Sequence, residues 1–140
     1  MNSIDTHCHI HDPEFFSPEE AEIVLRQAVN NGVTKLVCVG TSLEDSKKAI
    51  AFAHAHPEFC WASIGIHPHE ASNLKPVDIT DQLTTLNNLA DDSKVVAIGE
   101  CGFDFYYNDK DAHLTAQEAL LRGQIEIALS HRLPLVFHVR

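Results

Sequence analysis

The sequence lacks long hydrophobic runs and any leader-like start. No stretch of about eighteen apolar residues occurs, and no basic segment followed by an apolar run stands at the N-terminus. We therefore expect a soluble cytoplasmic protein with no membrane partner. Low-complexity tracts and linker-like segments are also missing. The 140 residues, 44% hydrophobic and 21% charged, suit one globular unit with a sizeable core.

Basic residues are scarce. The chain has ten Lys and Arg against twenty Asp and Glu, which gives a formal net charge of −10. The basic residues are scattered and form no stripe of the kind that a sequence-independent DNA-binding protein uses. An acidic chain ordinarily avoids polyanions. Any grip on a phosphate must therefore be local, and bound divalent cations would supply it.

Several motifs of known chemistry are absent. The sequence has no G-x-G-x-x-G and no P-loop, which argues against dinucleotide and nucleoside-triphosphate sites, and no G-x-S-x-G, which argues against a serine nucleophile. It also has no C-x-x-C spacing. Each of the four cysteines stands in or beside an apolar run, so we expect reduced, buried thiols. They are Cys8, Cys38, Cys60 and Cys101.

Short apolar runs alternate with amphipathic segments along the chain. The first expected strand ends at 7–9, and the later ones cover 35–39, 60–66, 95–98 and 135–137. The expected helices begin at the capping boxes or caps of 17–20 and 42–45, around Ile79, and at the capping box of 115–118. Nearly continuous apolar strands separated by helices are typical of a parallel sheet covered by helices.

A doubly wound sheet and a (β/α)₈ TIM barrel both begin with this pattern. Without nucleotide motifs the open sheet loses support, and a barrel needs about 250 residues. We therefore interpret residues 1–140 as the N-terminal portion of a single α/β barrel domain, comprising its first five strands and four helices. Strands one and five would then be unpaired edges, which predicts self-association through them.

The segment Asp5-Thr6-His7-Cys8-His9 places two imidazoles two residues apart. In a strand, His7 and His9 share one face with their Cα atoms roughly 7 Å apart, whereas Cys8 points to the other face. Two rings on one face can chelate one cation. The alternative, in a chain with ten histidines, is a chance pair of solvated rings.

Polar residues also stand at the C-terminal ends of later strands. Glu100 follows an apolar strand, where its carboxylate needs a metal or a salt-bridge partner. His138 ends the fifth strand, as a metal ligand or as a core histidine. Because this edge of a parallel sheet or barrel supplies binding residues, we predict a metal site there.

Two further residues at the same edge leave their roles open. His67 precedes Pro68, which favours an extended geometry that would aim the ring into the site, although a helix-capping role is an equal alternative. Arg140 shares a face with His138, and its planar guanidinium would hold a phosphate or a carboxylate.

The remaining histidines and some aromatic residues favour simpler interpretations. Five histidines are expected to be solvated on loops or helix ends: His11, His54, His56, His113 and His131. Two aromatic pairs could stack on nucleic-acid bases, but packing in a lid or core is the favoured interpretation. These pairs are Phe15-Phe16 and Tyr106-Tyr107.

Four segments together resemble the TatD family of metal-dependent deoxyribonucleases. They span the chain in the family's order: Asp5–His9, Gly65–His69, Gly99–Phe105 and Pro134–Arg140. The resemblance implies a barrel of the metal-dependent hydrolase superfamily that hydrolyses DNA phosphodiester bonds with divalent cations, commonly in two adjacent sites. It further implies that His7 and His9 bind one cation, that Glu100 bridges, and that His138 binds the second.

The same resemblance makes Glu100, Arg140 and His67 the candidate catalytic residues, the last two near the substrate phosphate. The sequence departs from the family's pattern at two points. His11 occupies a position where the family commonly has an acidic residue, although Asp12 follows directly. The family also supplies a histidine from a sixth strand and an aspartate from the eighth, so we expect residues 1–140 alone to lack full activity.

The expected reaction is hydrolysis by metal-activated water, with Mg²⁺, Mn²⁺ or Zn²⁺ as the cation. An acidic chain that holds one phosphate through metal is better suited to DNA ends or single strands than to wrapping a duplex. One alternative is a barrel hydrolase that acts on amides or esters. Another is a non-catalytic half barrel that binds metal weakly or associates with other chains.

Overall fold

Five parallel strands form one sheet in the order β1-β2-β3-β4-β5, and helices cover it. The computed structural model describes residues 2–106 and 113–140. The elements are β1 (Ser3–Cys8), α1 (Pro18–Asn30), β2 (Val33–Val39), α2 (Leu43–Ala55), β3 (Cys60–Ile64), η1 (Pro68–Asn73), α3 (Pro76–Leu89), β4 (Val95–Phe103), α4 (Leu114–His131) and β5 (Leu135–Val139). This is the strand and helix arrangement of half a (β/α)₈ barrel, which confirms the predicted fold class.

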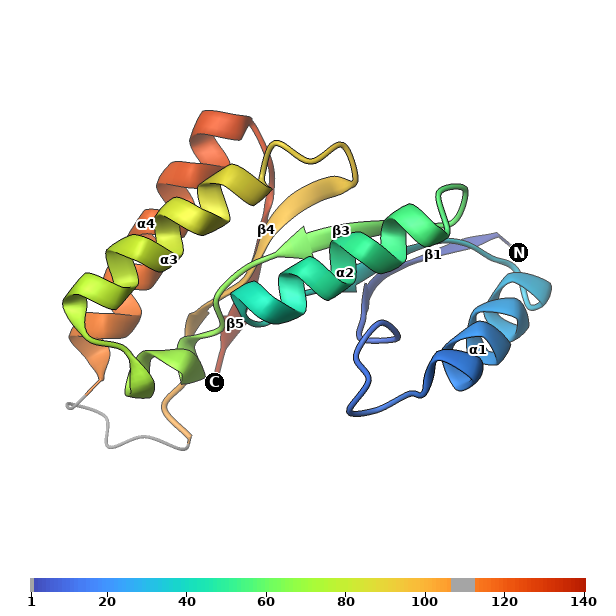
Figure 1. The fold of residues 1–140 in the computed structure, drawn as a ribbon, viewed down its shortest axis with the longest axis horizontal. Coiled ribbons are helices and arrows are strands. Elements are labelled where there is room, and N and C mark those ends of the chain that lie inside the picture. The colour runs from blue at the N-terminus through green and yellow to red at the C-terminus, as the bar shows by residue number, and fades with distance from the viewer. Residues whose placement is uncertain (1, 107–112) are drawn as a thin grey trace.

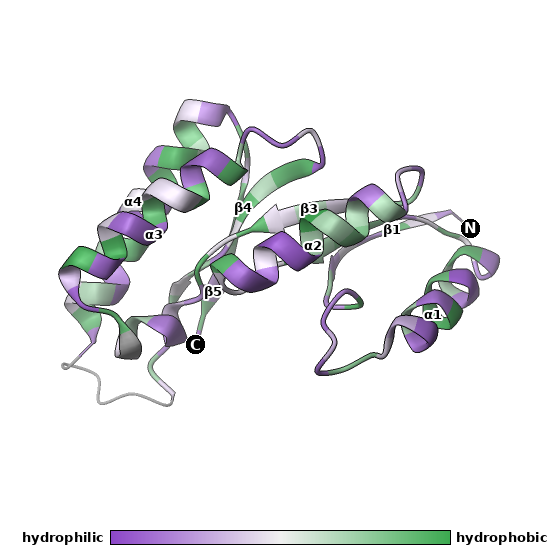
Figure 2. Ribbon diagram, viewed as in Figure 1, coloured by the Kyte–Doolittle hydropathy of each residue, from purple (hydrophilic) through white to green (hydrophobic). Residues whose placement is uncertain are grey.

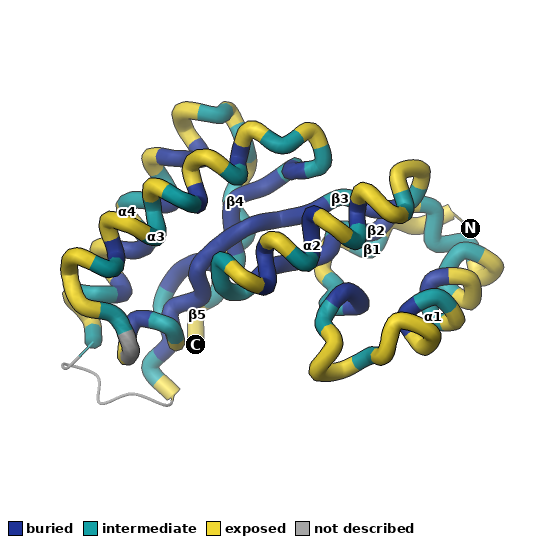
Figure 3. Tube along the Cα trace, in the orientation of Figure 1, coloured by how far each residue is buried: buried dark blue, intermediate teal, exposed yellow. Residues whose placement is uncertain are grey.

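The helices are spread around the curved sheet. Figure 1 shows α1 beside the β1 end, α2 across the middle strands, and α3 with α4 together beside β4. The hydropathy colouring shows polar and apolar residues interspersed along the helices, as expected for helices that pack one face on a sheet (Figure 2). The core is deepest along β3 and β4, which are almost wholly buried (Figure 3).

Capping residues set where the helices begin. Ser17 forms the predicted capping box with Glu20, since its hydroxyl accepts from the Glu20 amide and the Glu20 carboxylate accepts from the Ser17 amide. The predicted box at Thr115 is wrong. α4 begins at Leu114 after His113, which makes no side-chain cap, and Gln117 is instead buried with its amide group bonded to the backbone of Asp104.

Four register shifts interrupt the strand pairs, and two of them give an extra residue to a strand that carries a candidate ligand. Between the pairs Asp5–Leu36 and Cys8–Cys38, β1 advances by three residues while β2 advances by two. Between the pairs Ile98–Leu135 and Cys101–Phe137, β4 likewise advances by three while β5 advances by two. Bulges of this kind re-aim a side chain and are frequent beside binding sites. Here they fall at His7 and at Glu100.

The outer strands are far more exposed than the middle ones. Ile4 in β1 is 61% exposed, and Phe137 and Val139 in β5 are 58% and 76% exposed. Unlike these side chains, the four thiols are buried or half-buried and free, as predicted. The Cys8 thiol donates to the Val37 carbonyl. Among the described residues, no helix is long and apolar enough to cross a membrane.

Candidate metal centre

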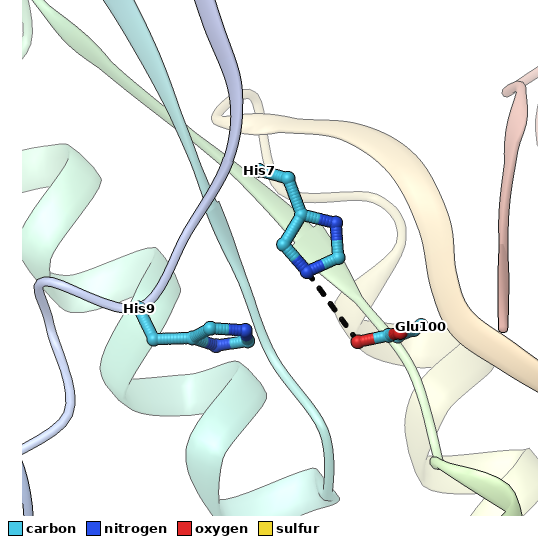
Figure 4. Close-up of side chains that lie close together, drawn as sticks. All are labelled: His7, His9 and Glu100. Carbon is cyan, nitrogen blue, oxygen red and sulfur yellow. Dashed lines mark ion pairs between the residues drawn. The ribbon is translucent and has the colours of Figure 1, made fainter.

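His7, His9 and Glu100 converge at the C-terminal ends of β1 and β4. Their potential ligand atoms all lie within 4.8 Å of one another. The two imidazole rings meet edge to face with centroids 5.2 Å apart, and His7 Nε2 lies 3.5 Å from Glu100 Oε2 (Figure 4). The rings of His7 and His9 therefore lie against each other beside Glu100, while their role as metal ligands stays a prediction.

Glu100 reaches this position through a glycine-flanked bulge. Gly99 and Gly102 have φ values of 138° and 147°, a region that favours glycine. A Cβ on Gly99 would collide with the backbone of Val136, and one on Gly102 with the carbonyl of His138. The two glycines thus allow β5 to lie close against β4 on both sides of the carboxylate.

A second group joins Glu100 to His67 and His138. The potential ligand atoms of these three residues also lie within 4.8 Å of one another. His138 Nδ1 is 3.0 Å from Glu100 Oε1. Since Glu100 belongs to both groups, its two carboxylate oxygens face opposite ways, one toward His7 and one toward His138.

His67 both caps a helix and faces the site. Its Nδ1 accepts from the backbone amide of His69 at the start of η1. Its ring is buried and lies 4.2 Å from the ring of His138. Burial, together with the neighbouring His138 and His69, lowers the pKa of His67 to about 4, so the ring is neutral at physiological pH.

Asp104 is a polar residue of this region to which the sequence analysis assigned no role. It is 1% exposed, and its Oδ2 lies 3.0 Å from His138 Nε2 and accepts from Arg140 Nη2 at 2.9 Å. Its Oδ1 accepts from the Tyr106 amide. The guanidinium of Arg140 therefore holds a carboxylate here, one of its two predicted kinds of partner. The one sequence signal for a role of Asp104 is that an acidic residue stands directly after a buried strand.

His11 is not solvated, contrary to expectation. Its side chain is fully buried, and its Nε2 lies 3.1 Å from Asp45 Oδ1, near the start of α2. Asp45 also accepts from the amide and hydroxyl of Thr41. Although burial opposes ionisation, hydrogen bonds from His11 and Thr41 lower the pKa of Asp45. The chain turns inward after β1 because this buried carboxylate offers the imidazole a partner.

The other expected surface histidines lie mostly in ion pairs. His54 pairs with Asp92 at 2.9 Å, and His56 pairs with Glu22 at 3.1 Å. Their rings are 50% and 17% exposed, so His56 is less solvated than expected.

A cavity of about 420 Å³ opens beside the first group. The segment after β1, the start of α2 with the residues before it, and η1 line the cavity: His9, Asp12, Glu14, Phe15, Thr41, Ser42, Glu44, Asp45, Lys48, His69 and Glu70. The Phe15 ring is 66% exposed, whereas Phe16 packs against the core. Tyr106 lies under the Arg140 guanidinium at 4.7 Å, and Tyr107 falls outside the described residues.

The donor set fits a divalent cation. Imidazole nitrogens with a carboxylate oxygen suit zinc, manganese and related ions. The side chain of His7 is 43% exposed, so the first group is accessible to solvent.

Known proteins share this architecture. The profile of the family described as TatD related DNase matches residues 4–140. A "3'-5' ssDNA/RNA exonuclease TatD" of Pantoea sp. (strain At-9b) is 38% identical over 122 residues, which cover 87% of this chain and 45% of that protein. The corresponding protein of Pectobacterium parmentieri is 35% identical over 125 residues, 89% and 45% of the two chains. The chain thus spans about half the length of the curated relatives it matches.

Solved structures of TatD family proteins have the same fold. A TatD homologue from Escherichia coli superimposes with a TM-score of 0.80 at 31% identity, covering 98% of this chain and 50% of that one. A TatD family hydrolase from Entamoeba histolytica gives 0.78 at 26% identity, covering 99% and 50%. With a family match over nearly its whole length, this chain belongs to the TatD-related DNase family.

Proposed function

We propose that residues 1–140 form the N-terminal portion of a barrel domain that hydrolyses phosphodiester bonds of nucleic acid with two divalent cations, Mg²⁺, Mn²⁺ or Zn²⁺. In this proposal His7 and His9 bind one cation, His138 binds the other, and Glu100 bridges them. The observation that supports it is the shared carboxylate, because each of its oxygens faces a different imidazole.

When bound, such cations activate water for attack and neutralise charge that develops on the phosphate. The chain's own residues position the reactants. Glu100 holds both cation sites at one spacing, and the neutral ring of His67 offers a hydrogen bond without adding charge. Arg140, whose side chain is 46% exposed, stands at the rim as the residue that would meet the substrate phosphate.

The substrate in this proposal is DNA with a free end or a single strand, and the relatives named for single-stranded DNA and RNA support it. The cavity beside His9 is large enough for one nucleoside. Exposed Phe15 at its wall provides a surface on which an unpaired base can stack. Its acidic lining disfavours a second phosphate there, which suits a terminal nucleoside.

The edge strands and the thiols bear on how the whole chain associates and where it is located. Its exposed edge strands, with Ile4 in β1 and Phe137 in β5, favour self-association in the absence of further βα units. Its four free thiols suit a reducing compartment, which supports a cytoplasmic location.

Two proteins test the function: residues 1–140, and a fusion of these residues to the C-terminal half of the Pantoea relative. Calorimetric titration with Mn²⁺ and Zn²⁺ should show binding to both. The fusion should release mononucleotides from single-stranded DNA, whereas residues 1–140 alone should do so weakly. A folded, metal-loaded fusion that cleaves ester or amide substrates but no nucleic acid would contradict the proposal.

A further inference from the structure

Asp104 lies just beyond β4 and is almost completely removed from water. One of its oxygens contacts two different functional side chains, His138 and Arg140. Burying a carboxylate without partners is strongly unfavourable, so Asp104 depends on its three hydrogen-bond partners to stay in this buried position. Its contacts are the Tyr106 amide, the Arg140 guanidinium and the His138 ring, all of which can donate to a carboxylate.

This acceptor determines which nitrogen of His138 faces the metal. Nε2 lies against Asp104, and Nδ1 lies against Glu100. With Nε2 turned to Asp104, Nδ1 is the nitrogen that faces Glu100 and the second group of potential ligands. A carboxylate behind a metal-binding imidazole fixes which ring nitrogen is presented to the cation.

Arg140 depends on the same oxygen. Its Nη2 donates to Asp104 Oδ2, while its guanidinium stacks over the ring of Tyr106. The contact fixes one corner of a planar group that has five N–H donors. One carboxylate thus holds the His138 ring and the Arg140 guanidinium at a fixed spacing.

We propose that Asp104 is a positioning residue that orients His138 for metal binding through Nδ1 and holds Arg140 at the phosphate side of the same site. The inference rests on the proposed function and extends it. It joins the metal-binding and phosphate-binding halves of the site through a residue that contacts neither metal nor substrate.

The test uses Asp104→Asn, which keeps the size of the side chain but replaces one acceptor oxygen by a donor. Calorimetric titration of residues 1–140 with Zn²⁺ should show affinity lowered by about 10–100-fold, the usual effect of losing a partner behind a metal-binding histidine. Asp92→Asn is the matched control, because Asp92 also hydrogen-bonds a histidine, His54, but away from the site. It should change the Zn²⁺ affinity less than about twofold.

A second control separates the two contacts of Asp104. Arg140→Met removes the guanidinium but leaves the Asp104–His138 contact, so Zn²⁺ affinity should stay near that of the wild type. The affinity of the Zn²⁺-loaded chain for inorganic phosphate should fall in Arg140→Met and also in Asp104→Asn.

Nitrogen NMR of the Zn²⁺-loaded wild type gives a readout that needs no Asp104 variant. With histidine rings labelled with ¹⁵N, and His138 assigned from His138→Gln, the expected state is Nε2 protonated and Nδ1 bound to zinc. Zinc on Nε2, or unchanged affinity in folded Asp104→Asn, would overturn the inference and leave the proposed function standing. A wild-type chain that binds no Zn²⁺ would overturn both.

Discussion

His7 on β1 and Glu100 on β4 meet with His7 Nε2 3.5 Å from Glu100 Oε2, although β2 and β3 lie between their strands in the sheet. The curvature of the sheet brings β1 and β4 toward each other at their C-terminal ends. A site that depends on curvature in this way requires the whole set of intervening strands to be folded.

Removing His7 should weaken metal binding. His7→Ala deletes one of three donors in the first group, and we expect Mn²⁺ and Zn²⁺ affinity to fall at least about tenfold in calorimetric titration. His54→Ala is the control, since His54 is a half-exposed histidine paired with Asp92 outside the site. Equal loss in both variants would indicate nonspecific binding by histidines.

Replacing Phe15 should change substrate affinity more than turnover. Stacking on an aromatic ring contributes about 1–3 kcal/mol per base, so Phe15→Ala in the fusion protein should raise KM for single-stranded DNA several-fold or more with kcat nearly unchanged. Phe15→Trp should restore KM. Steady-state kinetics on single-stranded, blunt and recessed DNA measure these effects. Cutting of supercoiled circles as well as or better than single strands would contradict the preference for ends.

Adding a methyl group to Gly102 should destabilise the β4–β5 pair. Gly102→Ala places a Cβ against the His138 carbonyl at a φ of 147°, and we expect a loss of about 2–4 kcal/mol in the free energy of unfolding. Urea denaturation followed by circular dichroism measures it. Gly123→Ala in α4 contacts only the flexible end of Leu83, so this control should change stability far less.

The buried pair of His11 and Asp45 should be important for stability. Asp45→Ala leaves the His11 ring and the Thr41 amide without their acceptor, which should cost about 2–4 kcal/mol. Asp91→Ala, at an 80% exposed side chain, should stay within about 0.5 kcal/mol of the wild type. Because folding lowers the pKa of Asp45, its contribution is present above its unfolded pKa and is lost as pH falls through the folded value. The gap between wild type and Asp45→Ala should therefore shrink in acid.

The exposed edge at β5 should promote association of residues 1–140. Sedimentation velocity is expected to show dimers or larger species, and Phe137→Lys with Val139→Lys should shift them toward monomer. Leu129→Lys serves as the control because Leu129 is 73% exposed on α4, away from the strand edge. A wild-type monomer at all concentrations would exclude edge association.

The sequence was informative where one local rule decided the outcome. The alternation of helices and apolar strands predicted the element order, and the Ser17 capping box predicted the start of α1. The convergence of His7 and Glu100 could also be anticipated, because parallel strands place their C-terminal ends at one edge.

The sequence was uninformative where long-range partners decided the outcome. The sequence around His11 gives no sign that its ring contacts Asp45, 34 residues further along, so a loop histidine was expected to be solvated. Thr115 and Glu118 satisfy the capping pattern, but the helix starts one residue earlier and Gln117 faces Asp104. The role of Asp104 depends on contacts with β5, which no local pattern encodes.

The extra residues in β1 and β4 relate strand register to metal preference. Deleting one residue from either bulge would exchange inward and outward positions beyond it, because side chains alternate along a strand. The thiols of Cys8 or Cys101, now turned away, would then replace an imidazole or a carboxylate at the centre. A softer donor there would shift selectivity toward thiophilic ions such as Cu(I), so the register of β1 and β4 bears on which cation the proposed site would select.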